Sequence, residues 1–238
     1  MDFYRATESD TKYIKHEKSL IHNTALIASE DAEVIGVLEY EIKNLEEAEI
    51  INFNIFKFHD ERVVFKGFID EIKYWNSYLK RILCKDGSII KEDILKDAGF
   101  KKESTWILHI RDYVEVFKID INKITPEQLT ADKVKINKVS SWIESSEDIV
   151  ITCVKIKDKI VCIDGYSRLL VAYNKGFKYV YAYFEEENVD IKFFETCLKW
   201  CEKEKIFTIK DLTNRIVTPE EHERLWVSRC QAYFREQK

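Results

Sequence analysis

Apolar and polar positions alternate over the first 110 residues in a way that predicts a mixture of strands and helices. Val64, Phe68 and Ile72 recur every four residues, so they share one face of a helix predicted over residues 61–80, continued by Trp75 or Leu79. Before this helix, the pattern predicts a strand at 3–6, a helix at 8–21 begun by a Thr7 cap, a hairpin of 25–28 with 34–42 that turns at Glu30-Asp31, and a strand at 50–58. After it, the pattern predicts a strand at 81–84, a helix at 91–98 ended by Gly99, and a strand at 105–110.

The second half of the chain begins with strands and ends with helices. A strand is predicted from Val161 to an Asp164-Gly165 turn, followed by a helix and a strand that closes near residue 183. Helices are predicted at 190–203, at 208–216 and from Thr218-Pro219 to about residue 235. The last two begin with a capping hydroxyl, at Thr208 and Thr218, and carry an acidic residue three positions later.

The length of the chain favours two domains of modest size. The chain has 238 residues, of which 45% are hydrophobic, so it can bury ample core. It has only six glycines and two prolines, and the domain boundary must therefore be found from a change of pattern. We place a linker at 113–130, between domains at 1–112 and 131–238.

Composition narrows the classes of partner. The net charge is −5 with both signs mixed, and the basic runs at Lys101-Lys102 and 133–138 are short, so DNA is not an expected partner. No 18-residue apolar run and no signal-peptide pattern occur, which predicts a cytoplasmic protein with no membrane partner. The six cysteines lack metal-type spacing and are expected to stay reduced; Cys197 and Cys201 are expected to face the core, with no metal site.

The stretch Asp164-Gly165-Tyr166-Ser167-Arg168 is the strongest candidate for chemistry. Glycine permits a sharp turn, and the N–H groups at the start of the next helix are unpaired and lie at the positive end of its dipole. Ser167 and Arg168 add a hydroxyl and a guanidinium, both suited to phosphate oxygens. The alternative interpretation is a plain turn with a surface arginine.

DGYSR followed by LLVAYNKGFKYVYAY resembles the core motif of the ParB/sulfiredoxin superfamily, nearest to its DGHHR type, over about residues 134–184. The resemblance implies an entry strand at 134–139 (VKINKV) and a second strand at 149–155. The resemblance implies a nucleotide or phosphate site at Asp164, Gly165, Tyr166, Ser167 and Arg168, with ATP or CTP and magnesium as candidate ligands. Tyr166 and Ser167 stand where relatives carry a cysteine or histidines, and the second arginine of partition proteins is absent. The resemblance therefore favours phosphate binding over reductase, kinase or DNA-clamping activity.

Residues 2–112 resemble the GNAT-type N-acetyltransferase fold, in their element order and in the segment LKDAGFKKESTWILHI. Active members hold coenzyme A in a Gln/Arg-x-x-Gly-x-Gly/Ala loop, but here the segment reads HDERVVFKGF and only Arg62 and Gly67 match. We therefore expect a degenerate acetyltransferase domain. Tyr74, Tyr78 and Glu39 are the candidate acids or bases, although the tyrosines also suit core edges and Glu39 the solvent face of a strand.

The predicted architecture is α/β (α+β): a GNAT-like domain, a linker, and a ParB/sulfiredoxin-like domain with a C-terminal helical extension. The leading hypothesis is binding of a nucleotide or a phosphorylated small molecule by the second domain. One alternative is an active acyl-CoA-dependent N-acetyltransferase that uses acetyl-CoA in the first domain. Another is a non-enzymatic interaction protein, such as a homodimer, in which both folds have lost their chemistry.

Overall fold

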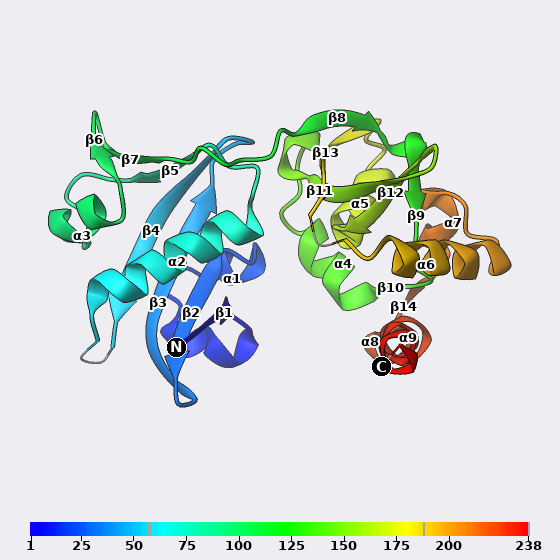
Figure 1. Cartoon of the computed structure of the whole chain (residues 1–238), viewed down its shortest axis with the longest axis horizontal. Coiled ribbons are helices and arrows are strands. Elements are labelled where there is room, and N and C mark those ends of the chain that lie inside the picture. The colour runs from blue at the N-terminus through cyan, green and yellow to red at the C-terminus, as the bar shows by residue number, and fades with distance from the viewer. Residues whose placement is uncertain (57–58, 188, 238) are drawn as a thin grey trace. The chain divides into compact units, whose positions relative to one another are not determined.

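The computed structural model describes residues 1–56, 59–187 and 189–237. The chain divides into two compact units, Met1–Glu115 (unit 1) and Val116–Lys238 (unit 2), each built on its own β-sheet (Figure 1). Both units mix strands with helices, and the second ends in helices. The predicted α/β fold class is therefore confirmed.

Unit 1 contains a seven-stranded sheet in the order β1-β2-β3-β4-β5-β7-β6. Its strands are β1 (Asp2–Arg5), β2 (Ala25–Glu30), β3 (Glu33–Ile42), β4 (Glu47–Ile55), β5 (Arg81–Cys84), β6 (Lys101–Lys102) and β7 (Trp106–His109). Neighbours are antiparallel except β4 and β5, which pair in parallel from Glu47 with Arg81 to Ile50 with Cys84. The order of strands and helices in unit 1 agrees with the order predicted from the sequence, and β6 is an additional short strand that pairs with β7.

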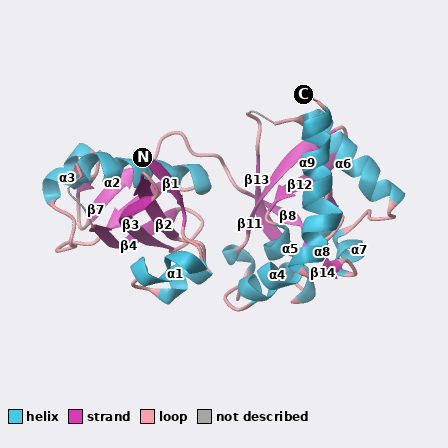
Figure 2. Ribbon diagram, turned by 90° about the horizontal axis from the view of Figure 1, so that it is seen from below, coloured by secondary structure: helices cyan, strands magenta, loops and turns pink. Residues whose placement is uncertain are grey.

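Helices cover both faces of this sheet (Figure 2). On one face lies α2 (Glu61–Trp75), whose buried side includes Phe65 and Phe68 at 5.1 and 6.3 Å between ring centroids from Phe53 of β4. On the other face, Ile27 and Val37 pack against side chains of the 3₁₀ helix η1 (Glu8–Tyr13) and of α1 (Glu17–Ile21). The apolar face predicted for α2 is thus confirmed. The short α3 (Glu92–Asp97) precedes β6.

The helix predicted at 8–21 is instead broken in the middle, because a buried carboxylate takes up its backbone. Glu39 of β3 is fully buried, and its oxygens accept hydrogen bonds from the N–H groups of Lys15 and His16, both at 2.8 Å. These donors are then lost to any helix, and the chain runs extended between η1 and α1. The prediction that Glu39 faces solvent is wrong. The predicted strand at 50–58 ends at Ile55, and residues 57–58 lie outside the described part of the chain.

Unit 2 is built on a five-stranded sheet in the order β8-β13-β11-β12-β9. Its strands are β8 (Phe117–Asp120), β9 (Ile124–Pro126), β11 (Val150–Ile156), β12 (Lys159–Asp164) and β13 (Tyr179–Phe184). β11 and β12 form an antiparallel hairpin, and β13 returns parallel to β11. Residues 117–126, inside the range predicted as a linker, supply the two outer strands. A separate parallel pair joins β10 (Ala131–Asp132) to β14 (Ile216–Val217).

The helices of unit 2 follow the predicted order with one correction. They are α4 (Lys133–Ser140), α5 (Tyr166–Asn174), α6 (Ile191–Lys203), α7 (Ile209–Thr213), α8 (Pro219–His222), the π-helical turn η4 (Glu223–Val227) and α9 (Ser228–Glu236), with 3₁₀ turns η2 (Ile121–Lys123) and η3 (Ser146–Asp148). The predicted strand at 134–139 is wrong: Asp132 caps α4 by accepting from the N–H of Val134 at 2.7 Å. Capping boxes at Thr208 and Thr218 are confirmed.

Gly67 provides a test of how tightly α2 packs. A Cβ at this position would lie 2.1 Å from the Phe3 ring, so we expect Gly67→Ala to destabilise the protein by about 1–3 kcal/mol. Helix propensity alone predicts the opposite sign, a gain of about 1 kcal/mol. Urea unfolding of Gly67→Ala, beside the exposed neighbour variant Lys66→Ala, measures the difference. A Gly67→Ala protein that is more stable than the parent contradicts the packing argument.

Candidate functional site

The turn between β12 and α5 requires glycine. Gly165 is the N-cap residue of α5 and has φ 97° and ψ 17°, a left-handed conformation that other residues seldom adopt. A Cβ there would lie 2.8 Å from Cγ2 of Ile151 and 3.2 Å from Nη2 of Arg168. Both the dihedral angle and the available space therefore exclude a side chain, and the backbone of the turn is left open.

The first turn of α5 has no side-chain cap. The first N–H inside the helix to find a backbone partner belongs to Leu169, which donates to the carbonyl of Gly165 at 2.9 Å. The N–H groups of Tyr166, Ser167 and Arg168 precede it, and Gly165 has no side chain that could accept from them. A helix start in this state attracts an anion, because its N–H groups and its dipole both favour negative charge.

Arg168 lies beside this helix start in a weak ion pair. Its Nη2 atom is 3.3 Å from Oδ2 of Asp164, and the two side chains are 30% and 75% exposed. Exposed pairs of this kind contribute little to stability, so the guanidinium can exchange its carboxylate for a phosphate at small cost. Ser167 is half-buried next to it. Of the predicted site residues, Asp164, Gly165, Ser167 and Arg168 thus gather around one helix terminus.

Tyr166 differs from the other four because its side chain belongs to the core. Its hydroxyl donates to the carbonyl of Cys162 and accepts from the N–H of Glu127 at 2.8 Å. Burial, followed by the nearby Glu127 carboxyl, raises the pKa of Tyr166 well above its usual value. Only the main chain of Tyr166 is therefore available to a ligand.

Glu127 is a functional candidate that the sequence did not reveal. Its side chain is 3% exposed, and its Oε2 atom has no hydrogen-bond partner among the described residues. Burial raises the pKa of Glu127 to about 8, although the nearby Cys197 thiol acts in the opposite direction. It follows a proline in a segment that reads as a loop, where acidic residues are usually solvated, so no sequence signal distinguishes it.

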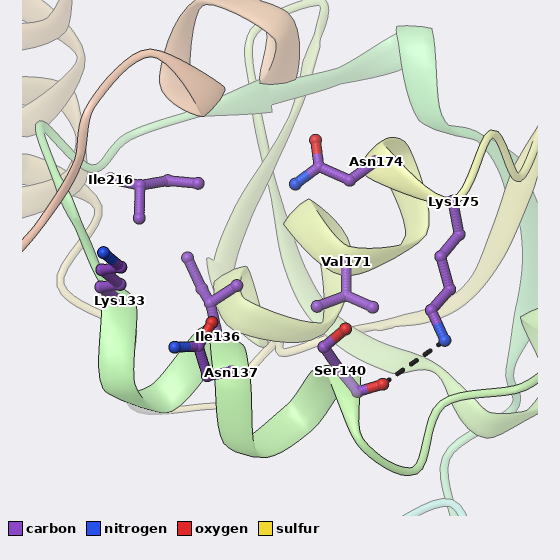
Figure 3. A pocket seen from close by; sticks show the side chains of 8 residues that line it. All are labelled: Lys133, Ile136, Asn137, Ser140, Val171, Asn174, Lys175 and Ile216. Carbon is purple, nitrogen blue, oxygen red and sulfur yellow. Dashed lines mark hydrogen bonds between the residues drawn. The ribbon is translucent and has the colours of Figure 1, made fainter.

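A pocket of about 340 Å³ lies between α4 and α5 (Figure 3). Three apolar side chains and five polar ones line it, and the lining residues are Lys133, Ile136, Asn137, Ser140, Val171, Asn174, Lys175 and Ile216. Lys175 is already engaged: its Nζ atom donates to the carbonyls of Ser140, at 3.4 Å, and Ile143, where the chain leaves α4. The pocket adjoins the C-terminal half of α5, so it is separate from the helix start at Gly165.

In unit 1, the residues that match the coenzyme A loop form part of a helix. Arg62 lies in the first turn of α2 and pairs with Asp93 at 2.6 Å and Asp97 at 2.9 Å. Asp60 caps the same helix by accepting from the N–H of Arg62 at 3.0 Å. Gly67 lies in the middle of α2. The Arg62 guanidinium is thus already paired with two carboxylates, and Gly67 belongs to a regular helix.

The candidate acids and bases of unit 1 have structural positions. The Tyr74 side chain is 73% exposed, whereas Tyr78 is buried. Besides its two backbone bonds, Glu39 accepts from Nδ2 of Asn52 at 2.8 Å and lies 3.1 Å from Nδ1 of His16. Its oxygens are fully occupied in holding β3, β4 and the segment before α1 together, so Glu39 is not free to accept a proton from a substrate.

The described residues provide neither a metal-binding cluster nor a membrane-spanning helix. No group of three or more histidine, cysteine or acidic side chains among them is arranged to hold a metal ion. None of the helices in this part of the chain is both long enough and apolar enough to cross a membrane. The cysteines, six in all, are free thiols.

Comparison with known proteins assigns no family. No family model matches the chain, and no curated protein does so either. Protein Atu1540 from Agrobacterium tumefaciens has 17% identity and a TM-score of 0.27, over 39% of this chain and 49% of its own, so the chain spans about half of that protein. Rv2747 from Mycobacterium tuberculosis, solved in complex with CoA and NLQ, has 11% identity and a TM-score of 0.29, over 41% of this chain and 81% of its own. Likenesses this slight assign no ligand.

The raised pKa of Glu127 predicts a pH-dependent stability. Because the folded state holds this proton above the ordinary pKa of 4.5, its contribution is fully present below pH 4.5 and is lost as pH rises through about 8. The slope can reach about 1.4 kcal/mol per pH unit. Glu127→Gln removes the charge, so its stability relative to the parent should increase from pH 5 to 8 and then level off.

Chemical denaturation at a series of pH values measures this trend. The exposed carboxylate variant Glu186→Gln is the control, and it should follow the parent at every pH. Parallel curves for Glu127→Gln and the parent would show that Glu127 is ionised in the folded protein.

Proposed function

We propose that unit 2 binds a phosphate-bearing small molecule, a nucleotide such as ATP or CTP with magnesium, at the start of α5. The observation that carries this proposal is an uncapped helix terminus with an arginine beside it. Three N–H groups, those of Tyr166, Ser167 and Arg168, lie ahead of the first intrahelical hydrogen bond. The resemblance of DGYSR to the ParB/sulfiredoxin motif supports the same position.

Each group has a distinct part in holding the phosphate. The N–H groups donate to its oxygens, and the Ser167 hydroxyl adds one further donor. Arg168 exchanges Asp164 for the phosphate and can make two parallel hydrogen bonds to it. Asp164, which is largely exposed, is then free to bind the water shell of a magnesium ion.

The proposed activity is binding, with no reaction assigned. Tyr166 occupies a position where relatives place a reactive side chain, but here that side chain is buried and its hydroxyl is hydrogen-bonded twice. The remaining polar side chains of the turn, those of Asp164, Ser167 and Arg168, suit the holding and neutralising of charge. A sensor or ligand-gated scaffold is consistent with this set.

Titration calorimetry with ATP, CTP, GTP and ADP, with and without magnesium, tests the proposal. We expect at least one nucleotide to bind, and Arg168→Ala to weaken it at least tenfold, because a charge-assisted bond to phosphate is worth about 1.5–3 kcal/mol. The exposed arginine variant Arg224→Ala is the matched control and should bind as the parent does.

Two outcomes would overturn the proposal. One is an absence of heat from all four nucleotides in protein shown to be folded by circular dichroism. The other is equal affinity in the parent and in Arg168→Ala. Acetyl-CoA belongs in the same series: binding that survives Arg168→Ala would place a coenzyme A site elsewhere and favour the acetyltransferase alternative.

A further inference from the structure

An aromatic contact joins α6 to α9, which lie side by side in unit 2 (Figure 2). Phe193 of α6 lies 5.2 Å from Tyr233 and 4.7 Å from Phe234, measured between ring centroids. Two turns further along α6, Trp200 lies 6.4 Å from Tyr233 and 6.2 Å from Trp226 of η4. The two helical segments are thus in contact on both sides of the position that Cys197 occupies.

Two thiols meet within this contact. Cys197 is four residues after Phe193 and three before Trp200, so it lies on the same face of α6. Cys230 of α9 is three residues before Tyr233, so the aromatic contacts bring it toward Cys197, and each thiol is the largest influence on the pKa of the other. Cys197 is fully buried whereas Cys230 is half-buried, so Cys230 is the more exposed of the two residues.

A buried carboxyl faces the same thiols. Glu127 follows β9, and its carboxyl shares an electrostatic environment with Cys197, Cys201, Cys230 and Tyr166, because it and these groups influence one another's pKa. Two arginines also belong to this environment: Arg229 beside Cys230, with its guanidinium 5.1 Å from the Trp200 ring centroid, and Arg215 near Cys201. The buried Oε2 atom of Glu127 has no hydrogen-bond partner among the described residues, so no structural contact explains its burial.

We propose that Cys197 and Cys230 form a reversible disulfide when the protein meets a hydroperoxide, with Glu127 as the base that takes the proton of Cys197. Cys230 is the thiol that reacts first, Cys197 is the thiol that resolves the product, and the disulfide fastens α9 to α6. The oxidant is hydrogen peroxide or a small organic hydroperoxide, and a small thiol reverses the reaction.

The chemistry balances in two steps. In the first, the Cys230 thiolate attacks one oxygen of the peroxide and the O–O bond breaks; hydroxide leaves, takes the proton that Cys230 had lost and becomes water. In the second, Glu127 takes the proton of Cys197, whose sulfur attacks the sulfur of the Cys230 sulfenic acid. The S–O bond breaks, and the departing hydroxide recovers the proton from Glu127 as a second water. Two electrons pass from the thiols to the peroxide.

The electrostatics agree with this order of events. A hydrogen bond from Cys197, with a smaller contribution from Arg229, lowers the pKa of Cys230, which favours its thiolate. The pKa of Cys197 is raised, first by its hydrogen bond with Cys230 and then by burial, so it needs a base. Glu127, with a pKa of about 8, becomes a better-populated base as pH rises toward 8.

The test uses the full chain, treated with a small excess of hydrogen peroxide at pH 7. We expect the intact mass to fall by two hydrogens, with a peptide map that joins Cys197 to Cys230 and a return to the starting mass on addition of dithiothreitol. Cys197→Ser and Cys230→Ser should abolish the cross-link. Cys201→Ser, one turn further along α6 and almost fully buried, is the matched control and should retain it.

Glu127→Gln separates the two steps. Its Cys230 should react with peroxide as fast as in the parent, but the sulfenic acid, trapped with dimedone, should persist at least tenfold longer. The rate of disulfide closure in the parent should increase with pH up to about 8, and Glu127→Gln should lose that increase. A purely structural Glu127 would leave this pH profile unchanged.

Three results would overturn the proposal. One is a cross-link between a different pair, such as Cys153 and Cys162, which lie opposite each other on β11 and β12. Another is oxidation of Cys230 to the sulfinic acid while Cys197 stays a free thiol. The third is no reaction at all in the parent protein. This result requires no variant, so it cannot be due to a variant that fails to fold.

Discussion

The arrangement of unit 2 depends on the two hydrogen bonds that the hydroxyl of Tyr166 makes. By donating to Cys162 and accepting from Glu127, it joins the first residue of α5 to β12 and to the end of β9. Both bonds are buried, so losing either would leave an unpaired polar group in the core. The start of α5 is therefore held in place by the buried side chain of Tyr166, and it has no side-chain cap.

The same contact links the two proposals made for unit 2. Glu127 provides an N–H to Tyr166 and a carboxyl to the thiols between α6 and α9. A phosphate at the turn and a disulfide in the helical layer would thus act on opposite sides of one buried tyrosine. Such a shared element is what communication between two sites requires, because each site then biases the same piece of structure.

Unit 1 is held together by contacts among its own side chains and backbone. Glu39 ties β3, β4 and the segment before α1 together, and Asp60 and Arg62 turn the start of α2 into a network of side-chain contacts. Four phenylalanine rings pack on one another with no ligand between them: Phe3, Phe53, Phe65 and Phe68. Stability here comes from burial and internal hydrogen bonds, which do not depend on a coenzyme.

The sequence by itself determined most of the elements and the position of the turn at Gly165, because these follow from local spacing: the α2 face, the two capping boxes and the glycine all act within a few residues. The tertiary structure decided the features that depend on contacts between residues distant in sequence. Glu39 breaks a helix from 23 residues away and is itself buried by that contact. Tyr166 turns inward, and Glu127 meets cysteines far along the chain. In each case a side chain is satisfied by partners distant in sequence, and only the folded chain brings those partners together.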